Sequence, residues 1–116
     1  MAGVTSFYNN RVRVVENTAA AINTEITAQN GEDYLASAIT FDAADHVFLL
    51  FTLNGYPEVL PTPPQKVNQV GTTQGDIDSD TTAEAEDGYV PTGVFADPGT
   101  GTFFILYQLL NEAPAP

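Results

Sequence analysis

The segment from His46 to Leu53 constrains the fold more strongly than any other part of the chain, because nearly all of its residues are apolar. Successive side chains of a strand point to opposite faces, so this run is apolar on both faces, which is typical of a central, doubly covered strand. Burying its six large apolar side chains contributes roughly 9–18 kcal/mol, and ordering its eight backbone residues costs about 8–16 kcal/mol. Since burial of one face would not exceed that cost, we expect a second sheet or a neighbouring subunit to cover the other.

Further strands are predicted where side chains alternate with a period of two. In residues 11–15 the two arginines fall on one face and two valines on the other. Residues 34–41 also alternate, and the acidic turn at residues 42–45 joins them to the central strand as a hairpin. Residues 93–96 and 102–110 lie on either side of a Gly-rich turn and predict a last hairpin. The apolar run of that last strand is also compatible with a buried helix.

Residues 20–29 fit two interpretations. As a strand, they alternate apolar and polar side chains, and the Asn30-Gly31 pair that follows accepts the positive φ of a two-residue hairpin turn. We favour the strand for that reason. In the helical alternative, apolar side chains share one face at helical spacing: Val15, Ala19, Ile22 and Ile26.

The sequence predicts one domain over residues 1–116, with an N-terminal arm at residues 1–10 and a C-terminal tail at residues 111–116. Residues 61–88 show no periodic segment and are interpreted as a long acidic loop containing Pro and Gly. No internal repeat is apparent. The expected fold class is all-β: a small antiparallel β-sandwich or barrel of about six strands with extended termini.

The charge balance excludes several classes of partner. Three basic residues, Arg11, Arg13 and Lys66, stand against fifteen acidic ones, giving a formal charge of −12. Nucleic-acid binding is not expected, because it needs Lys and Arg to displace counterions. No apolar run approaches the length of a membrane span and no secretory signal is recognised, so we expect a soluble protein without membrane contact. The acidity is also compatible with a high-salt habitat.

No catalytic set is apparent. His46 stands near Asp42 and Asp45, and Ser6, Ser37 and Ser79 are possible nucleophiles, but no nucleophile motif accompanies them. We therefore expect neither an enzyme nor a cofactor. The chain has no cysteine, which excludes disulfides and thiolate zinc sites.

One acidic pattern is compatible with calcium. Asp76, Asp78 and Asp80 alternate, and Asp87 stands at the twelfth place of the same stretch, as oxygen ligands of a calcium loop would. Thr81 replaces the glycine of the sharp turn in an EF-hand loop. We favour a solvated acidic loop and predict no metal site.

The basic residues near the N-terminus are the candidate partner contacts. Arg11 and Arg13 project from the same face of a predicted strand beside Phe7 and Tyr8, and these residue types are enriched at interface centres. We predict that Phe7, Tyr8, Arg11 and Arg13 bind a protein partner or another copy. In the alternative, the arginines neutralise acidic residues of an adjacent strand.

A small acidic β module without cysteine, with apolar ends and a long Pro/Gly/Asp-containing segment, resembles the accessory head proteins of tailed viruses, called decoration or cement proteins. The resemblance implies a structural role on the surface of the virion. Copies, often trimers, would bridge subunits of the major capsid protein. The alternative is a carbohydrate- or ligand-binding β module of a fibre or adhesin, with Tyr34, Tyr56 and Tyr89 lining a site.

Overall fold

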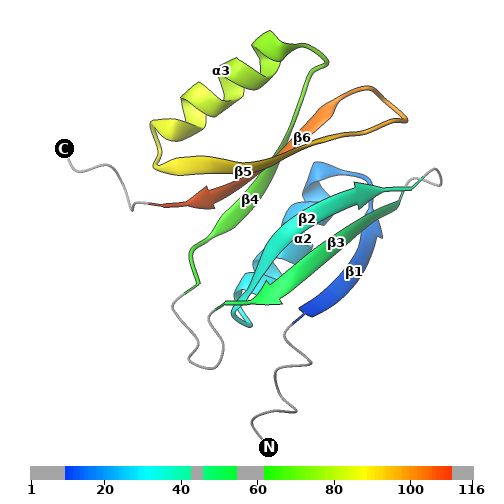
Figure 1. The fold of residues 1–116 in the computed structure, drawn as a ribbon, viewed down its shortest axis with the longest axis vertical. Coiled ribbons are helices and arrows are strands. Elements are labelled where there is room, and N and C mark those ends of the chain that lie inside the picture. The colour runs from blue at the N-terminus through cyan, green and yellow to red at the C-terminus, as the bar shows by residue number, and fades with distance from the viewer. Residues whose placement is uncertain (1–9, 43–45, 55–61, 111–116) are drawn as a thin grey trace, which may run out of the picture.

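The computed structural model describes residues 10–42, 46–54 and 62–110. It is mostly β, with six strands in two antiparallel three-stranded sheets, and this confirms the predicted strand number and fold class (Figure 1). Sheet A has the order β1-β3-β2 and sheet B the order β4-β6-β5. The strands are β1 (Asn10–Glu16), β2 (Tyr34–Phe41), β3 (His46–Leu53), β4 (Gln65–Val70), β5 (Tyr89–Ala96) and β6 (Phe103–Leu109). The described residues also form two helices, α2 (Ala19–Asn30) and α3 (Gln74–Ala85).

The strand β3 is central in sheet A, as its sequence predicts. It pairs antiparallel with β1 on one side and with β2 on the other. Val47, Leu49 and Phe51 point to one face of the sheet and are fully buried there. That face lies against α2, so we call it the inner face of sheet A and the opposite one its outer face.

The expectation of a strand at residues 20–29 is wrong, because these residues form α2. The helix begins after Thr18, whose side-chain oxygen accepts a hydrogen bond from the backbone N–H of Ala21. Ile22 and Ile26, one turn apart, are both fully buried, as the helical alternative requires. The Asn30-Gly31 pair ends this helix instead of forming a hairpin turn.

The expectation of a long loop at residues 61–88 is also wrong, because this segment contains β4 and α3. A capping box starts α3: the Thr73 hydroxyl accepts from the backbone N–H of Asp76, and the Asp76 carboxylate accepts from that of Thr73. None of its residues is buried, so apolar periodicity could not reveal the helix.

The chain is built as a structural repeat, which the sequence analysis missed. Unit 1 (residues 10–53) is β1-α2-β2-β3, and unit 2 (residues 65–109) is β4-α3-β5-β6. In each unit the last strand in sequence lies between the other two in the sheet. The second strand in sequence has a register irregularity in both units, between Ala36 and Ala38 in β2 and between Pro91 and Gly93 in β5.

The two units also align in sequence, at a constant separation of 55 positions through the second strand and of 56 in the last strand, because the second hairpin turn is one residue longer. The following pairs are identical: Val12/Val67, Val15/Val70, Thr18/Thr73, Ile22/Ile77, Thr27/Thr82, Ala28/Ala83, Tyr34/Tyr89, Asp42/Asp97, Phe48/Phe104, Leu50/Leu106 and Leu53/Leu109. In many other pairs only the residue type is kept, as in Arg11/Lys66 and Glu25/Asp80. Below, residues paired in this way are called equivalent.

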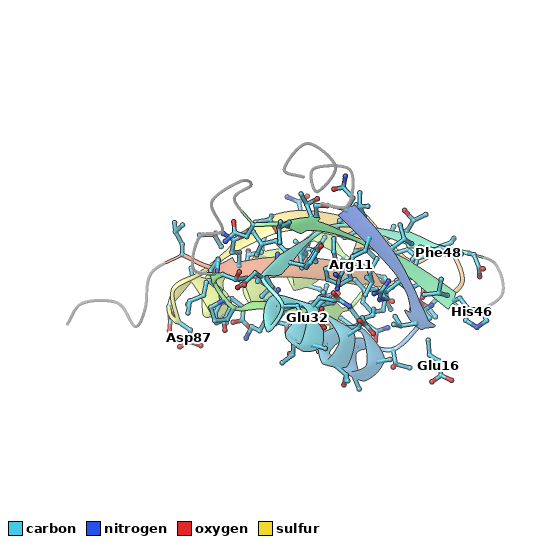
Figure 2. The ribbon with its side chains drawn as sticks, turned by 90° about the horizontal axis from the view of Figure 1, so that it is seen from below. Arg11, Glu16, Glu32, His46, Phe48 and Asp87 are labelled. Atoms are coloured by element: carbon cyan, nitrogen blue, oxygen red, sulfur yellow. The ribbon has the colours of Figure 1, made fainter. Side chains whose placement is uncertain are left out.

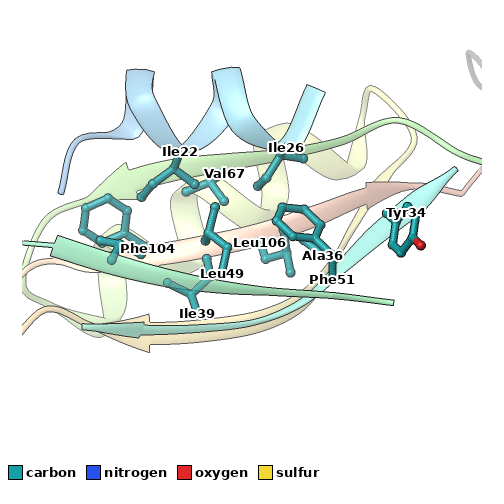
Figure 3. Packing of buried hydrophobic residues seen from close by; sticks show 11 residues of the cluster. Ile22, Ile26, Tyr34, Ala36, Ile39, Leu49, Phe51, Val67, Phe104 and Leu106 are labelled. Atoms are coloured by element: carbon teal, nitrogen blue, oxygen red, sulfur yellow. The ribbon is translucent and has the colours of Figure 1, made fainter. Parts of the chain in front are cut away.

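The units share one hydrophobic core (Figure 3). The inner face of sheet A and the buried side of α2 contribute Leu49, Ile22 and Ile26 among others, and sheet B contributes Val67, Phe104 and Leu106. In sheet B these three residues point away from α3, so they form its outer face. The outer face of sheet B therefore packs into unit 1, against α2 and the inner face of sheet A.

Candidate functional site

The outer face of sheet A carries an apolar surface that the chain leaves uncovered. Val12 and Val14 of β1 lie directly opposite Leu50 and Phe48 of β3 in the sheet register. All four are exposed to solvent. Ala38 of β2 pairs with Leu50 and extends the surface across the sheet. We call these five residues the outer apolar face.

A groove of about 490 Å³ follows this surface, and Val12, Ala38, Phe48 and Leu50 lie among its lining residues. Figure 2 shows Phe48 and His46 of β3 beside β1, at the end of the molecule opposite Asp87. Contiguous exposed apolar surface of this kind marks interaction sites in soluble proteins. It is also the side of the central strand for which the sequence requires a cover.

In unit 2 the equivalent surface, the outer face of sheet B, is covered by unit 1. Phe48 and Leu50 are 39% and 38% exposed, whereas the equivalent Phe104 and Leu106 are 0% and 1% exposed. Val12 is likewise exposed, and the equivalent Val67 is buried. The same apolar pattern is thus solvent-facing in one unit and part of the core in the other.

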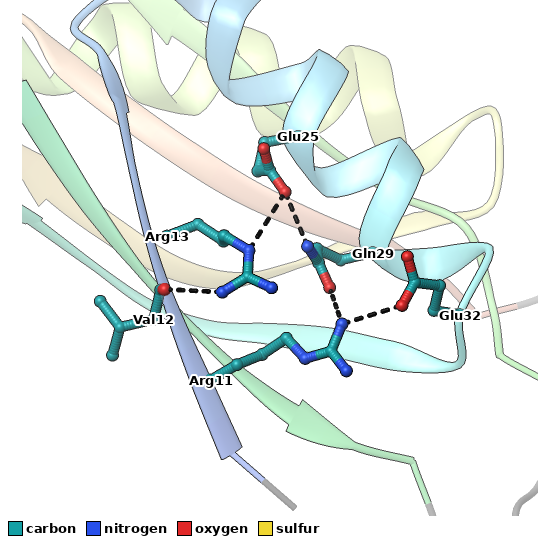
Figure 4. Close-up of polar contacts among 6 residues, drawn as sticks. All are labelled: Arg11, Val12, Arg13, Glu25, Gln29 and Glu32. Atoms are coloured by element: carbon teal, nitrogen blue, oxygen red, sulfur yellow. Dashed lines mark hydrogen bonds and ion pairs between the residues drawn. The ribbon is translucent and has the colours of Figure 1, made fainter.

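The inner face of β1 carries a polar cluster with α2 (Figure 4). Arg11 donates to Glu32 and to Gln29, each at 2.9 Å, and its guanidinium lies 3.7 Å from the centre of the Tyr34 ring. The hydrogen bond to Glu32 raises the pKa of Arg11 above its ordinary value. Arg13 lies 4.0 Å from Glu25. This cluster holds the helix against its own sheet.

Unit 2 has the equivalent cluster. Lys66 pairs with Glu84 at 2.7 Å and lies 4.5 Å from the ring centre of Tyr89, so Lys66 and Tyr89 occupy the places of Arg11 and Tyr34. Asn68, equivalent to Arg13, donates to Asp80 and Glu84.

Asp80 also accepts a hydrogen bond of 2.7 Å from the hydroxyl of Tyr107, which belongs to the sheet B face that α3 covers. Burial raises the pKa of Tyr107, and the bond to Asp80 raises it further. This bond has no counterpart in unit 1, where Phe51 takes the place of Tyr107. Because a cation paired with a carboxylate and with a tyrosine ring recurs in both units, we interpret the two clusters as structural.

Of the four predicted partner contacts, the structure describes Arg11 and Arg13. Phe7 and Tyr8 lie outside the described residues. β1 does place Arg11 and Arg13 on one face and the valines on the other, but the arginines face α2 and bind acidic groups of their own chain. This is the arrangement of the self-neutralisation alternative, with a helix in place of the neighbouring strand. The apolar side chains that β1 exposes are Val12 and Val14, which lie beside Leu50 and Phe48 of β3. In the sequence, the apolar residues on both faces of β3 were the indication that this face binds something.

Of the residues considered for catalysis, the described ones do not form a Ser-His-Asp arrangement. The imidazole of His46 is exposed at the start of β3, and its backbone N–H donates to Asp42. The Ser37 hydroxyl donates to the carbonyl oxygen of Leu50, and Ser79 is exposed on α3. Ser6 and Asp45 lie outside the described residues.

The acidic pattern considered for calcium belongs mainly to α3. Asp76 caps the helix, Asp80 binds Asn68 and Tyr107, and Asp78 is exposed. Carboxylates two positions apart on a helix diverge, so these three cannot surround one cation. Within residues 10–42, 46–54 and 62–110, no group of three or more possible ligands that could hold a metal ion occurs.

The tyrosines considered for ligand binding are also accounted for in part. Tyr34 and Tyr89 occupy equivalent places in different units, and each ring is in contact with a cation of its own unit. Tyr56 lies outside the described residues. Of the helices that the structure describes, neither is long and apolar enough to cross a membrane.

No protein-family model, curated protein or solved structure significantly matches this chain.

Proposed function

We propose that this chain is a structural protein that binds other protein subunits through the outer apolar face of sheet A. The observation that carries the proposal is the exposure of Phe48 and Leu50 on the central strand, opposite Val12 and Val14. A protein surface is the occupant favoured by the burial of the equivalent face of sheet B within this same fold. The more specific proposal, from the resemblance, is an accessory capsid protein of a tailed virus.

The capsid role predicts two classes of contact. The outer apolar face supplies buried apolar area, and the N-terminal arm with Phe7 and Tyr8 reaches a subunit of the major capsid protein. The formal charge of −12 weakens contacts between free copies and favours contacts with partner surfaces that are less acidic.

Site-directed photo-crosslinking tests this proposal. A benzoylphenylalanine at position 48 places the reactive group on the outer apolar face, and the same group at Thr27, exposed on α2, is the matched control. In cells that make the particles, we expect position 48 to cross-link to protein and position 27 to give much less product.

Mass spectrometry of the product from particles decides the more specific proposal. Cross-linking to the major capsid protein or to another copy on the particle supports the capsid role. Absence of the chain from purified particles overturns the capsid role, and absence of any protein cross-link at position 48 overturns protein binding by this face.

A further inference from the structure

The contact between the two units of one chain has two halves. The first half is the outer face of sheet B, where Val67, Phe104 and Leu106 point away from α3. The second half lies on unit 1, where Ile22 and Ile26 of α2 and Ile39 of β2 belong to the same buried cluster (Figure 3). The contact thus joins the outer face of one unit to the helix side of the other.

Hydrogen bonds fix the alignment of this contact at Val67. β4 is an edge strand, so its outward backbone groups have no strand to pair with. The Asn23 side chain of α2 binds both backbone groups of Val67: its Nδ2 donates to the carbonyl at 2.8 Å, and its Oδ1 accepts from the N–H at 2.7 Å. Asn30, the last residue of α2, accepts from the Gln65 N–H at 3.0 Å, so two asparagines dock α2 on the edge of sheet B.

Each half of this contact exists a second time in the chain and is uncovered there. The outer apolar face of sheet A repeats the first half, with Val12, Phe48 and Leu50 in the equivalent positions. The α3 side of unit 2 repeats the second half in part, because Ile77 and Val94 take the places of Ile22 and Ile39, whereas Thr81 takes the place of Ile26. There Val94 of β5 is 48% exposed, whereas the equivalent Ile39 is 4% exposed, and Ile77 of α3 is only half-buried.

We propose that the outer apolar face of one chain binds the α3 side of unit 2, at Ile77 and Val94, in a second copy of the same chain. This repeats between chains the contact that joins the units within each chain. The inference rests on the proposed function and names the partner of the outer apolar face. Because the two halves differ, the contact is heterologous, and successive copies form a ring or an open filament.

The equivalent polar positions make the contact between chains weaker than the one within a chain. Asp78 of α3 stands in the place of Asn23, and a carboxylate can accept from the Val12 N–H of the next copy but cannot donate to the Val12 carbonyl. That carbonyl already accepts from the guanidinium of Arg13 at 3.0 Å and has one lone pair left for a second donor. Pro91 takes the place of Ala36, whose N–H donates to Gln65 within the chain. Mutual repulsion of chains with charge −12 opposes association further, so we expect reversible assembly that added salt strengthens.

Two charge insertions test the contact in the full chain. Phe48→Asp removes the first half, Val94→Asp removes the second, and Thr27→Asp adds the same charge at an exposed control position of α2. In sedimentation velocity across a concentration series, we expect the wild type and Thr27→Asp to self-associate and each of the other variants to be monomeric.

Mixing the two monomeric variants is the decisive step. Each retains the half that the other lacks, so an equimolar mixture should give a dimer of one copy of each and nothing larger. Loss of association in Phe48→Asp but not in Val94→Asp would indicate a symmetric contact between two outer faces and overturn the proposal. No dimer in the mixture also overturns it.

A gain of affinity provides a test without loss of folding. Asp78→Asn restores the donor that Asn23 supplies within the chain, and Glu86→Gln removes the same charge at another exposed position of the α3 region. One added hydrogen bond should tighten association about fivefold beyond the effect of Glu86→Gln. Equal effects of the two changes would mean that Asp78→Asn acts only by removing a charge, and this would contradict the proposed alignment.

Failure here is distinguishable from failure of the proposed function. A wild-type chain that stays monomeric throughout the concentration series overturns the contact between copies. Position 48 could still cross-link to a different protein in that case, which would leave binding by the outer apolar face supported.

Discussion

The outer faces of the two sheets are built alike and have different surroundings. Phe104 and Leu106 of sheet B lie in the core between the units, and Phe48 and Leu50 of sheet A face solvent. The strands differ little in sequence, so their burial is decided by which unit has a neighbour on that side. An apolar strand face therefore indicates that another layer packs against it. The tertiary arrangement decides whether that layer comes from the same chain.

The largest expected effect is the difference in stability loss between alanine substitutions at the equivalent residues Phe104 and Phe48. Phe104→Ala should lower the free energy of unfolding by about 3–5 kcal/mol, because it leaves a cavity between sheet B and α2. Phe48→Ala should lower it by less than about 1 kcal/mol, because that ring is partly solvated and has little packing to lose.

Urea unfolding followed by circular dichroism, at concentrations where the chain is monomeric, measures both values. Similar losses in the two variants would mean that the outer face of sheet A is packed within the chain. The comparison between the two faces would then be wrong.

The next effect concerns Asn23, one of the two asparagines that dock α2 on sheet B. Asn23→Ala leaves the Val67 N–H and carbonyl without their partners and should cost about 1–3 kcal/mol of unfolding free energy. Asp78→Ala at the equivalent position of α3 should cost less than about 0.5 kcal/mol, because Asp78 is exposed. The same urea titrations apply, and a loss at Asp78 as large as that at Asn23 would contradict the assignment of its side as uncovered.

Much of the β structure follows from the sequence, because period-two alternation and the apolar β3 reflect local geometry and burial. The helices were harder for different reasons. In α2 the apolar spacing was present, but Asn30-Gly31 was assigned to a hairpin, although the same pair suits the end of a helix. In α3 only Ile77 is apolar and partly buried, and the Thr73-x-x-Asp76 capping box was the available signal.

The site was predictable only in part. The sequence indicates that a second layer must cover β3, but nothing local says which face the chain covers itself. The covered face is the one on which α2 packs. Because residues 20–29 were expected to form a strand, the expected fold had no helix to cover that face. The repeat was hidden because it keeps residue type more than identity, as in Arg11 and Lys66, and becomes visible only when the strands of both units are aligned.

A smaller effect separates the two polar clusters. Lys66→Met should cost about 1–2 kcal/mol, because it leaves the mostly buried carboxylate of Glu84 without its cation. Arg11→Met should cost roughly 0.2–1 kcal/mol, because its partner Glu32 is exposed and already well solvated. Thermal unfolding of the two variants in the same buffer compares them. A larger loss for Arg11→Met would show that its contacts with Gln29 and Tyr34 outweigh the ion pair.

The smallest effect compares the aspartates that begin the two hairpin turns. Asp97 is buried and accepts hydrogen bonds from the Asn17 side chain, the Gly99 N–H and the Thr100 hydroxyl. Burial acts to raise its pKa, but these bonds outweigh burial and lower the pKa of Asp97 below its ordinary value. The exposed Asp42 has the equivalent place and accepts from the N–H of His46.

A lowered pKa in the folded state means that the unfolded chain binds more protons in acid. The stability contributed by Asp97 is therefore complete above the ordinary carboxyl value of about 3.9 and is lost as the pH falls through the lowered value. Asp97→Asn should reduce the difference in unfolding free energy between pH 6 and pH 3 relative to the wild type. Thermal unfolding across that range measures it, and an equal pH dependence in the wild type and Asp97→Asn would show that Asn17 and the turn stabilise Asp97 no more when it is charged than when it is neutral.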